Sequence, residues 1–377
     1  MANDSGLRRR ISRFLASRAG IILVGLFIGV VAPLLQHAGN PPNMGICVAC
    51  FERDMAGALG LHRAAVVQYL RPEIIGFVLG ALASALAFRE FKPRGGSAPI
   101  ARFFLGVFAA IGALAFLGCP WRALLRLAGG DGNALIGLAG LLVGVGLGAA
   151  FLRRGYTLGR SAPATPLSGL ILPAVMLLFL GLVAYKVSFG PGGALFFSEK
   201  GPGAMHAALG VSLAAGLAIG ILAQRSRFCT MGAVRDAVLL RDFHLASGVA
   251  ALVVAAFATN LALGQFKTGF AAMPIAHSSH VWNFLGMVLS GLAFALAGGC
   301  PGRQLFLAGE GDGDAAVFVC GMIVGAAFAH NFFLAGVPDA MAEGVLKVGG
   351  PGHYGRIAVV AGLAFCALLG LTARRKA

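Results

Sequence analysis

Charged residues are scarce in this chain of 377 residues. Only 12% of them are Asp, Glu, Lys or Arg, whereas a soluble domain usually contains about 25%. Hydrophobic residues make up 58%, and the mean hydropathy is +0.85. This composition excludes an ordinary soluble domain and predicts a polytopic membrane protein.

Several sequence signals are also missing. The chain has no nucleotide-binding motif, so we do not expect it to hydrolyse ATP. Its seven cysteines are an odd number and do not suggest a disulfide framework. The first apolar run starts near Gly20 without a clean small-residue cleavage site, so we expect no cleaved signal peptide. No residue pattern predicts a cofactor.

Acidic residues are rarer than basic ones, at 14 against 30, which gives a formal net charge of +16. A strongly basic chain usually binds nucleic acid. Here most Lys and Arg residues lie at the ends of apolar runs, as the positive-inside bias of membrane proteins requires. The charge therefore predicts a lipid bilayer as partner and no nucleic acid, and it also favours an anionic substrate.

Ten apolar runs approach the length needed to cross a bilayer, about 17–25 residues. They fall at 20–36, 72–88, 102–117, 133–152, 166–187, 203–224, 245–264, 282–298, 314–335 and 356–373. Between them lie shorter, more polar elements at 43–60, 118–132, 226–242 and 299–313. Irregular backbone is tolerated at membrane depth only where protein surrounds it, so we expect buried broken or re-entrant helices. The predicted fold class is an all-α polytopic membrane protein.

Five spans in each half is an odd number, so the second half must run opposite to the first. This predicts two inverted repeats of about five helices each, as in many transporters. The charge bias places both termini in the cytoplasm, because the outer stretches 188–202 and 265–281 carry one lysine each. The expected organisation is a cytoplasmic segment 1–19, a first repeat 20–187, a linker 188–202, a second repeat 203–373 and a cytoplasmic tail 374–377.

The two halves share a Gly-Cys-Pro-x-Arg motif. Residues 118–122 read G-C-P-W-R, and residues 299–303 read G-C-P-G-R, 181 positions later. Pro suits the first turn of a new helix, whose free N–H groups attract an anion, and Arg adds a positive fork one turn on. The alternative is a small buried Cys and an Arg that reaches toward the interface. The repeated spacing favours a substrate site, which is formed by Cys119, Arg122, Cys300 and Arg303.

Each Gly-Cys-Pro-x-Arg motif is followed by a Gly-Asp-Gly at the same spacing. Asp131 and Asp312 are its acids, and we place both among structural or pathway polar residues.

In a second repeated pattern, an Arg-Asp pair follows a cysteine, and the aspartate lies seven residues after it. Cys47 precedes Arg53-Asp54, and Cys229 precedes Arg235-Asp236. Aspartate at membrane depth needs a partner, and the neighbouring arginine is the obvious one. The two Arg-Asp pairs are predicted to be structural or to line a pathway, and the two cysteines to bind substrate.

The remaining cysteines and histidines carry weaker signals. Cys47 and Cys50 form a C-x-x-C, which serves redox or zinc chemistry, but the equivalent of Cys50 in the second half is Gly232. Cys320 and Cys366 lie in apolar runs, so we expect them in the core. His277 and His280 are expected in a solvated loop, with an entrance site for a proton, metal or substrate as the alternative.

The sequence resembles the YeeE/YedE family of bacterial inner-membrane transport proteins, which includes thiosulfate-uptake proteins. Within the family it is similar to the YedE-related selenium metabolism membrane protein subgroup, over roughly 20–370. Stretches that carry this likeness include F-K-P-R-G-G-S (91–97), R-D-F-H-L-A-S-G (241–248) and W-N-F-L-G-M-V-L (282–289). The resemblance implies a monomeric, hourglass-like helical transporter in which central cysteines contact the passing anion. The matching positions are Cys47, Cys119, Cys229 and Cys300.

These observations predict an inner-membrane transporter for a small inorganic selenium or sulfur anion, and not an enzyme. Helix N-termini and arginines lower the barrier to negative charge, while neutral thiols donate weak hydrogen bonds to soft atoms. A cytoplasmic sulfur- or selenium-carrier protein is a further candidate partner. The alternatives are a thiosulfate or sulfite uptake carrier, and a membrane thiol redox or selenium-transfer enzyme that uses Cys47 and Cys50.

Overall fold

Long helices dominate the protein. The computed structural model describes residues 2–185, 187 and 195–373. The longer helices are α1 (Ala2–Leu15), α2 (Arg18–His37), α4 (Pro72–Ala87), α5 (Pro99–Phe116), α7 (Asn133–Arg153), α8 (Pro166–Ala184), α9 (Leu209–Ser226), α11 (His244–Ala262), α12 (His280–Ala297), α14 (Gly313–Asn331) and α15 (His353–Thr372). Four shorter helices lie between them: α3 (Val48–Ala58), α6 (Pro120–Ala128), α10 (Thr230–Leu240) and α13 (Pro301–Gly309).

Each of the ten apolar runs overlaps one of these longer helices, which confirms the predicted all-α polytopic membrane fold. Among the described residues, nine candidate spans are long and apolar enough to cross a membrane, and three of them continue into a short helix. The tenth run is α4, whose 16 residues extend only about 24 Å, less than the bilayer core of about 30 Å. It begins at Pro72, directly after the buried Arg71.

Helices from the two halves of the chain alternate in the bundle. α2 packs against α11 and α4 against α9, while α5 packs against α14 and α7 against α12. Glycines allow close crossings: a Cβ at Gly76 of α4 would lie 2.7 Å from the backbone of Gly216 in α9. Buried side chains of both halves form one continuous hydrophobic cluster, so neither half has a separate core.

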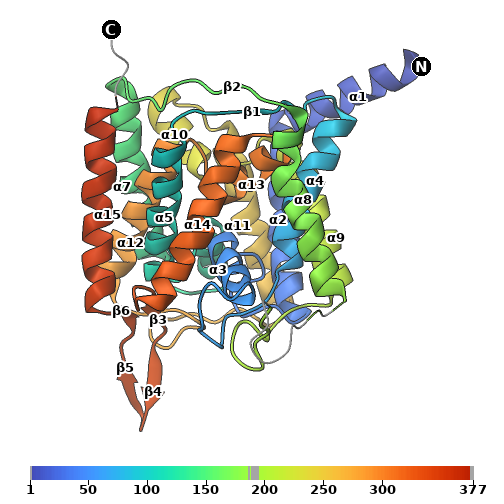
Figure 1. The fold of residues 1–377 in the computed structure, drawn as a ribbon. Helices are drawn as coiled ribbons and strands as arrows, with labels where there is room; N and C mark the ends of the chain where they lie inside the picture. Colours follow the sequence, from blue (N-terminus) through green and yellow to red (C-terminus); the bar gives the residue numbers. More distant parts are fainter. Residues whose placement is uncertain (1, 186, 188–194, 374–377) are drawn as a thin grey trace.

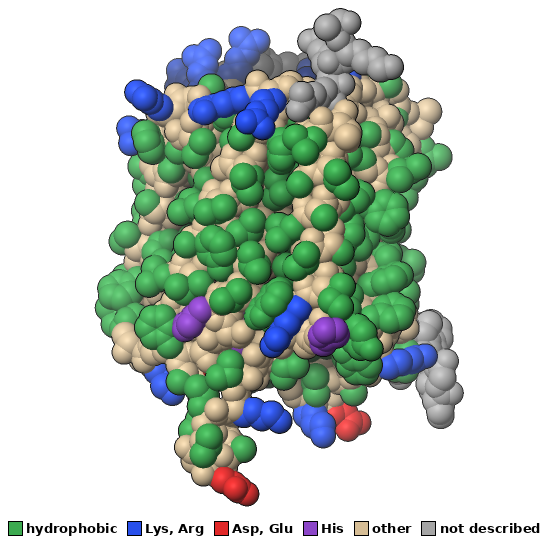
Figure 2. Space-filling model, turned by 90° about the vertical axis from the view of Figure 1, so that its left-hand side faces the viewer, with side chains coloured by type: hydrophobic (Ala, Val, Ile, Leu, Met, Phe, Trp, Pro, Cys, Tyr) green, Lys and Arg blue, Asp and Glu red, His purple; other side chains and the backbone are tan. Residues whose placement is uncertain are grey.

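The two ends of the bundle differ. α1, the C-terminal end of α15 and the pairing of β1 (Arg94–Gly95) with β2 (Ala162–Pro163) lie at one end, here called the terminal end (Figure 1). The hairpin of β4 (Ala340–Ala342) and β5 (Val345–Lys347) projects from the other, the hairpin end, next to β3 (Gly336–Val337) and β6 (Gly350–Pro351). On the face in Figure 2, a broad apolar belt separates the ends, and Lys and Arg side chains lie at both of them.

The predicted linker and tail are only partly described. Residues 188–194 of the linker 188–202, and the tail 374–377, lie outside the described residues. Of the expected cytoplasmic segment 1–19, residues 2–15 form α1.

Candidate functional site

Each of the four short helices begins at a cysteine. Cys47, Cys119, Cys229 and Cys300 are the N-cap residues of α3, α6, α10 and α13 in that order. All four cysteines are buried, with at most 5% of the residue exposed. Helix N-termini present free N–H groups and the positive end of the helix dipole. The sequence motifs therefore place four thiols where an anion is favoured.

The first pair of thiols comes from the first half of the chain. Cys47 Sγ lies 3.8 Å from Cys119 Sγ, within reach of a weak S–H···S hydrogen bond. Cys47 Sγ also accepts the backbone N–H of Cys50 at 3.3 Å, which caps α3. The structure therefore brings together two cysteines that are 72 positions apart in the sequence.

The second pair comes from the second half and has related geometry. Cys229 Sγ accepts the backbone N–H of Cys300 at 3.5 Å and that of Gly232 at 3.2 Å. The Gly232 contact corresponds to the Cys50 contact in the first half. Gly232 thus supplies the same backbone donor without a thiol, so the shared role of this position is helix capping.

A cavity of about 350 Å³ leads to the second pair from the terminal end. Its rim includes the exposed Arg227 and Asp242, whereas Cys229 and Gly232 are buried. Among its lining residues are four arginines and two aspartates, an excess of positive charge. These charged residues are Arg225, Arg227, Arg235, Asp236, Asp242 and Arg303. We call this cavity the basic vestibule.

The edge of the basic vestibule is held by ion pairs. Arg225 pairs with Glu90, and this hydrogen bond lowers the pKa of the Glu90 carboxyl below its usual value. Arg303 Nη1 lies 3.4 Å from Glu310 Oε1, and each side chain is 12% exposed. Ser226 also lines the vestibule, and its buried hydroxyl oxygen has no hydrogen-bond partner.

Arg122 is placed differently from its repeat partner Arg303. It is fully buried and donates to the carbonyls of Asn43, Leu117 and Ile275, with Nη1 also 3.7 Å from Cys50 Sγ. These contacts occupy four of its five N–H groups. Arg122 therefore contributes positive charge near the first thiol pair, but its donors are directed at backbone carbonyls.

The C-terminal end of α5, from which Cys119 follows, is capped by side chains. His277 Nε2 lies 2.7 Å from Ala115 O, and Arg126 Nη1 donates to Phe116 O at 3.0 Å. Such groups satisfy carbonyls that the broken helix would otherwise leave unpaired. The solvated-loop prediction is therefore wrong for His277, which is fully buried; His280 is exposed, but it is the first residue of α12 and not part of a loop.

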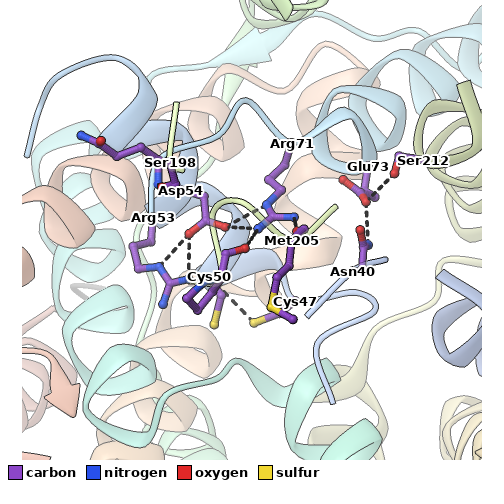
Figure 3. A network of polar contacts seen from close by, with 12 residues as sticks. Asn40, Cys47, Cys50, Arg53, Asp54, Arg71, Glu73, Ser198, Met205 and Ser212 are labelled. Carbon is purple, nitrogen blue, oxygen red and sulfur yellow. Dashed lines mark hydrogen bonds and ion pairs between the residues drawn. The ribbon is translucent and has the colours of Figure 1, made fainter. Parts of the chain in front are cut away.

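Arg53 and Asp54 form part of a buried network (Figure 3). Asp54 Oδ1 accepts Arg53 Nη2 at 2.7 Å, and Asp54 Oδ2 accepts Arg71 Nε at 2.8 Å. Arg71 also donates to the carbonyls of Pro202 and Met205 in the second half. One carboxylate thereby holds two arginines and connects α3 to both halves of the chain.

The equivalent pair Arg235–Asp236 is more open. Arg235 Nε lies 2.8 Å from Asp236 Oδ1, but these side chains are 32% and 17% exposed and line the basic vestibule. The two repeat copies of one sequence pattern thus have different surroundings.

The two Gly-Asp-Gly elements share a backbone shape and differ in partners. Gly130 and Gly311 have φ of 95° and 94°, values that glycine adopts without a Cβ penalty. Asp131 is fully buried and accepts Arg126 Nε at 2.6 Å. Asp312 caps α14 by accepting Ala315 N and pairs with Arg94 at 2.7 Å. The Arg126 contact of Asp131 is local, whereas Asp312 also pairs with Arg94 of the first half, so both aspartates hold loops and helix ends.

The remaining cysteines separate into two classes. Cys366 is buried as predicted, whereas Cys320 is exposed on the outer face of α14, so its assignment to the core is wrong. An apolar run is the same in composition whether its side chains face protein or lipid. Among the described residues, no group of three or more His, Cys, Asp or Glu side chains is arranged to hold a metal ion.

Sequence reasoning missed three buried residues near the thiols: Arg71, Arg126 and Trp121. Trp121 is 1% exposed and lies at the start of α6, directly after Cys119-Pro120. A signal was available for two of them, because the repeat equivalents of Arg126 and Trp121 are Leu307 and Gly302. The positions to inspect were those at which the two copies of a repeated motif carry different residues.

Residues 225–376 match the model of a protein family described as Sulphur transport. The matched part begins just before α10 and includes Cys229, Cys300 and Arg303, so this part of the chain is similar to sulphur-transport proteins. No curated protein sequence matches the chain.

Proposed function

We propose that this protein transports a small inorganic sulfur or selenium anion across the bacterial inner membrane by passing it between buried thiols. The observation that carries the proposal is the placement of two cysteine pairs at the N-termini of four short helices. The family match to sulphur transport supports a sulfur-type substrate. Thiosulfate is the substrate we test first, with selenite and sulfite beside it.

The chemistry of the path suits an anion that must leave as well as enter. Neutral thiols are weak donors, and a series of weak sites permits conduction. The basic vestibule raises the local concentration of anions before they reach Cys229. A cytoplasmic carrier protein for sulfur or selenium is a candidate to exchange substrate at this vestibule.

The orientation follows from charge and packing. Both ends of the described chain lie at the terminal end, and so do the segments around β1 and β2 that carry Arg89, Lys92, Arg153, Arg154 and Arg160, so this end faces the cytoplasm. The packing of α2 on α11 corresponds to that of α9 on α4, as expected if 20–187 and 203–373 are inverted repeats. In this arrangement the basic vestibule opens to the cytoplasm.

Uptake of labelled thiosulfate, sulfite and selenite into proteoliposomes tests the proposal. Cys119→Ser replaces a soft donor by a more strongly hydrated hydroxyl and is expected to lower uptake about tenfold, equivalent to about 1.4 kcal/mol. Cys320→Ser is the matched control, because Cys320 lies on the outer face of α14, and uptake should be unchanged.

Cys50 separates the relay from the thiol redox or selenium-transfer alternative. Cys50 contacts Cys47 through its backbone N–H, which serine retains, so Cys50→Ser should keep most of the uptake. Redox chemistry of the C-x-x-C would instead require the Cys50 thiol. Loss of activity in Cys50→Ser together with normal uptake in Cys119→Ser would replace the relay by that chemistry.

A further inference from the structure

Trp121 lies where the two repeats meet. Its equivalent 181 positions later is Gly302, and the two residues are in contact. A Cβ built at Gly302 would lie 3.1 Å from Trp121 Cε2 and Cζ2, and 3.2 Å from Nε1. These distances are tighter than an ordinary Cβ contact, so glycine lets the indole lie against the backbone of α13. The asymmetric Trp–Gly pair therefore allows one aromatic ring to occupy the junction of α6 and α13.

The indole contacts residues that adjoin the second thiol pair, and Trp121 itself follows a cysteine of the first pair. Cys119 precedes Trp121 by two residues, and Cys300 precedes the contacting Gly302 by two residues. The ring of Phe228, directly before Cys229, lies 5.5 Å from the Trp121 ring. Phe77 and Phe306 add further ring contacts at 5.8 and 6.3 Å. An anion that passes from one thiol pair to the other meets these aromatic rings, which we call the aromatic plug.

The polar atom of the plug is unused. Trp121 Nε1 is buried and has no hydrogen-bond partner. A buried indole N–H usually finds a partner, because an unpaired donor costs free energy. The same donor would form a charge-assisted hydrogen bond with an anion placed beside it. An unpaired donor near both thiol pairs is thus suited to a ligand that is present only in passing.

We propose that Trp121 closes the path between the two thiol pairs and donates its indole N–H to the anion as the anion crosses. This inference rests on the proposed transport function and adds a specificity-determining gate to it. The ring excludes water and other ions at rest, and the N–H offers a site to an anion that displaces the ring.

The chain offers a direct optical test, because it contains two tryptophans. The other one, Trp282, is near the start of α12, where Arg356 lies 5.5 Å from its ring. In Trp282→Phe, all tryptophan emission therefore comes from Trp121. Titration of this purified variant with thiosulfate should give a saturable change in emission, at concentrations that match the KM of uptake. The converse variant Trp121→Phe, which retains Trp282, should give none.

Transport by Trp121→Phe isolates the N–H, because the ring remains and the donor is lost. We expect a KM for thiosulfate about tenfold higher, corresponding to about 1.4 kcal/mol. Trp121→Ala removes the plug and should also increase the passive leak of chloride through the proteoliposomes. Gly302→Ala forces the ring to shift and should raise the KM in the same direction.

The outcomes distinguish the gate from the transport function. Normal wild-type uptake, combined with flat emission in Trp282→Phe and an unchanged KM in Trp121→Phe, overturns the gate and leaves transport standing. A wild-type protein that takes up neither thiosulfate, sulfite nor selenite overturns the transport function, and the gate with it. A saturable emission change together with a raised KM in Trp121→Phe supports both.

Discussion

Replacing Arg122 by alanine should destabilise the protein strongly, and replacing its repeat partner Arg303 should not. Arg122 satisfies the carbonyls of Asn43, Leu117 and Ile275 inside the bundle. Each buried carbonyl left without a donor costs about 1–3 kcal/mol, so the loss of three donors in Arg122→Ala should lower the free energy of unfolding by about 3–9 kcal/mol. Arg303 has one partly exposed ion pair with Glu310, worth about 1 kcal/mol or less.

Reversible unfolding in mixed detergent micelles measures the two losses side by side. Arg122→Lys is the informative intermediate, because it retains the charge but lacks the planar fork that reaches several carbonyls. We expect it to recover less than half of the loss. Arg303→Ala should insert at normal abundance and raise the KM for the transported anion, since it lowers the positive charge of the basic vestibule.

The result that would refute this reasoning is an equal effect of the two alanine variants on stability. A loss below about 1 kcal/mol in Arg122→Ala would mean that water replaces the guanidinium without cost. Arg122 would then be free to serve the anion directly, as the sequence motif alone suggests.

Two further predictions concern buried charge. Asp54→Asn leaves two buried arginines without a carboxylate and should cost about 3–5 kcal/mol in unfolding free energy, whereas Asp236→Asn at the vestibule should cost about 1 kcal/mol or less. Burial, with a smaller contribution from Arg126, lowers the pKa of His277 from 6.5 to about 4. The unfolded chain therefore takes up this proton first as pH falls below 6.5, and the stability lost between pH 7 and pH 4 should be about 3 kcal/mol. His277→Gln should remove that share of the pH dependence, and His280→Gln should keep it, as measured by unfolding at each pH. Equal dependence of the unfolding free energy on pH in wild type and His277→Gln would contradict the assignment.

Hydropathy predicted the helices well because long apolar runs have few alternatives in a bilayer. It placed the start of α9 at 203, whereas the helix begins at Leu209. Residues 202–204 form a turn and 205–208 lack regular structure; they are held by tertiary contacts, such as Ala207 N donating to Asn40 Oδ1 at 2.9 Å. Apolar composition is the same for a helix and for a buried segment without regular structure, so only the partner in the other half of the chain decides between them.

The Gly-Cys-Pro-x-Arg motifs predicted the helix starts after Cys119 and Cys300, because Pro suits a first turn; that Cys47 and Cys229 are also N-cap residues was not predicted. The repeated motifs did not predict Arg71, the second arginine on Asp54, because that partner is 17 positions away and is selected by the way α3 packs on α4. The neighbour Arg53 was accessible to sequence reasoning and is a partner. Partners that are close in the sequence can thus be predicted from spacing, whereas partners that are far apart can be identified only from the folded structure.

Matched charged residues of the two repeat motifs differ in the same way: the copy in the first half of the chain is the more buried. In the first half, Arg122 and the Arg53–Asp54 pair are buried and fixed by backbone carbonyls or a second arginine. In the second half, Arg303 and the Arg235–Asp236 pair line a cavity and are partly exposed. An arginine that is fixed by other partners acts on an anion through its electric field, which is strong where the dielectric constant is low. A partly exposed arginine can also move to contact the anion.

In the proposed relay, this asymmetry lets a symmetric motif serve two stages of one path. Arginines that move with the anion suit its capture from water at the vestibule, because they replace the lost hydration. Arginines that cannot follow the anion suit the interior, because they lower the barrier without holding the ion in place. Trp121 lies at the boundary between the two regimes, in contact with Gly302 across the repeat junction. Inverting the pair, with Trp121→Gly and Gly302→Trp in one chain, should therefore restore the plug but place its N–H on the other side of the junction.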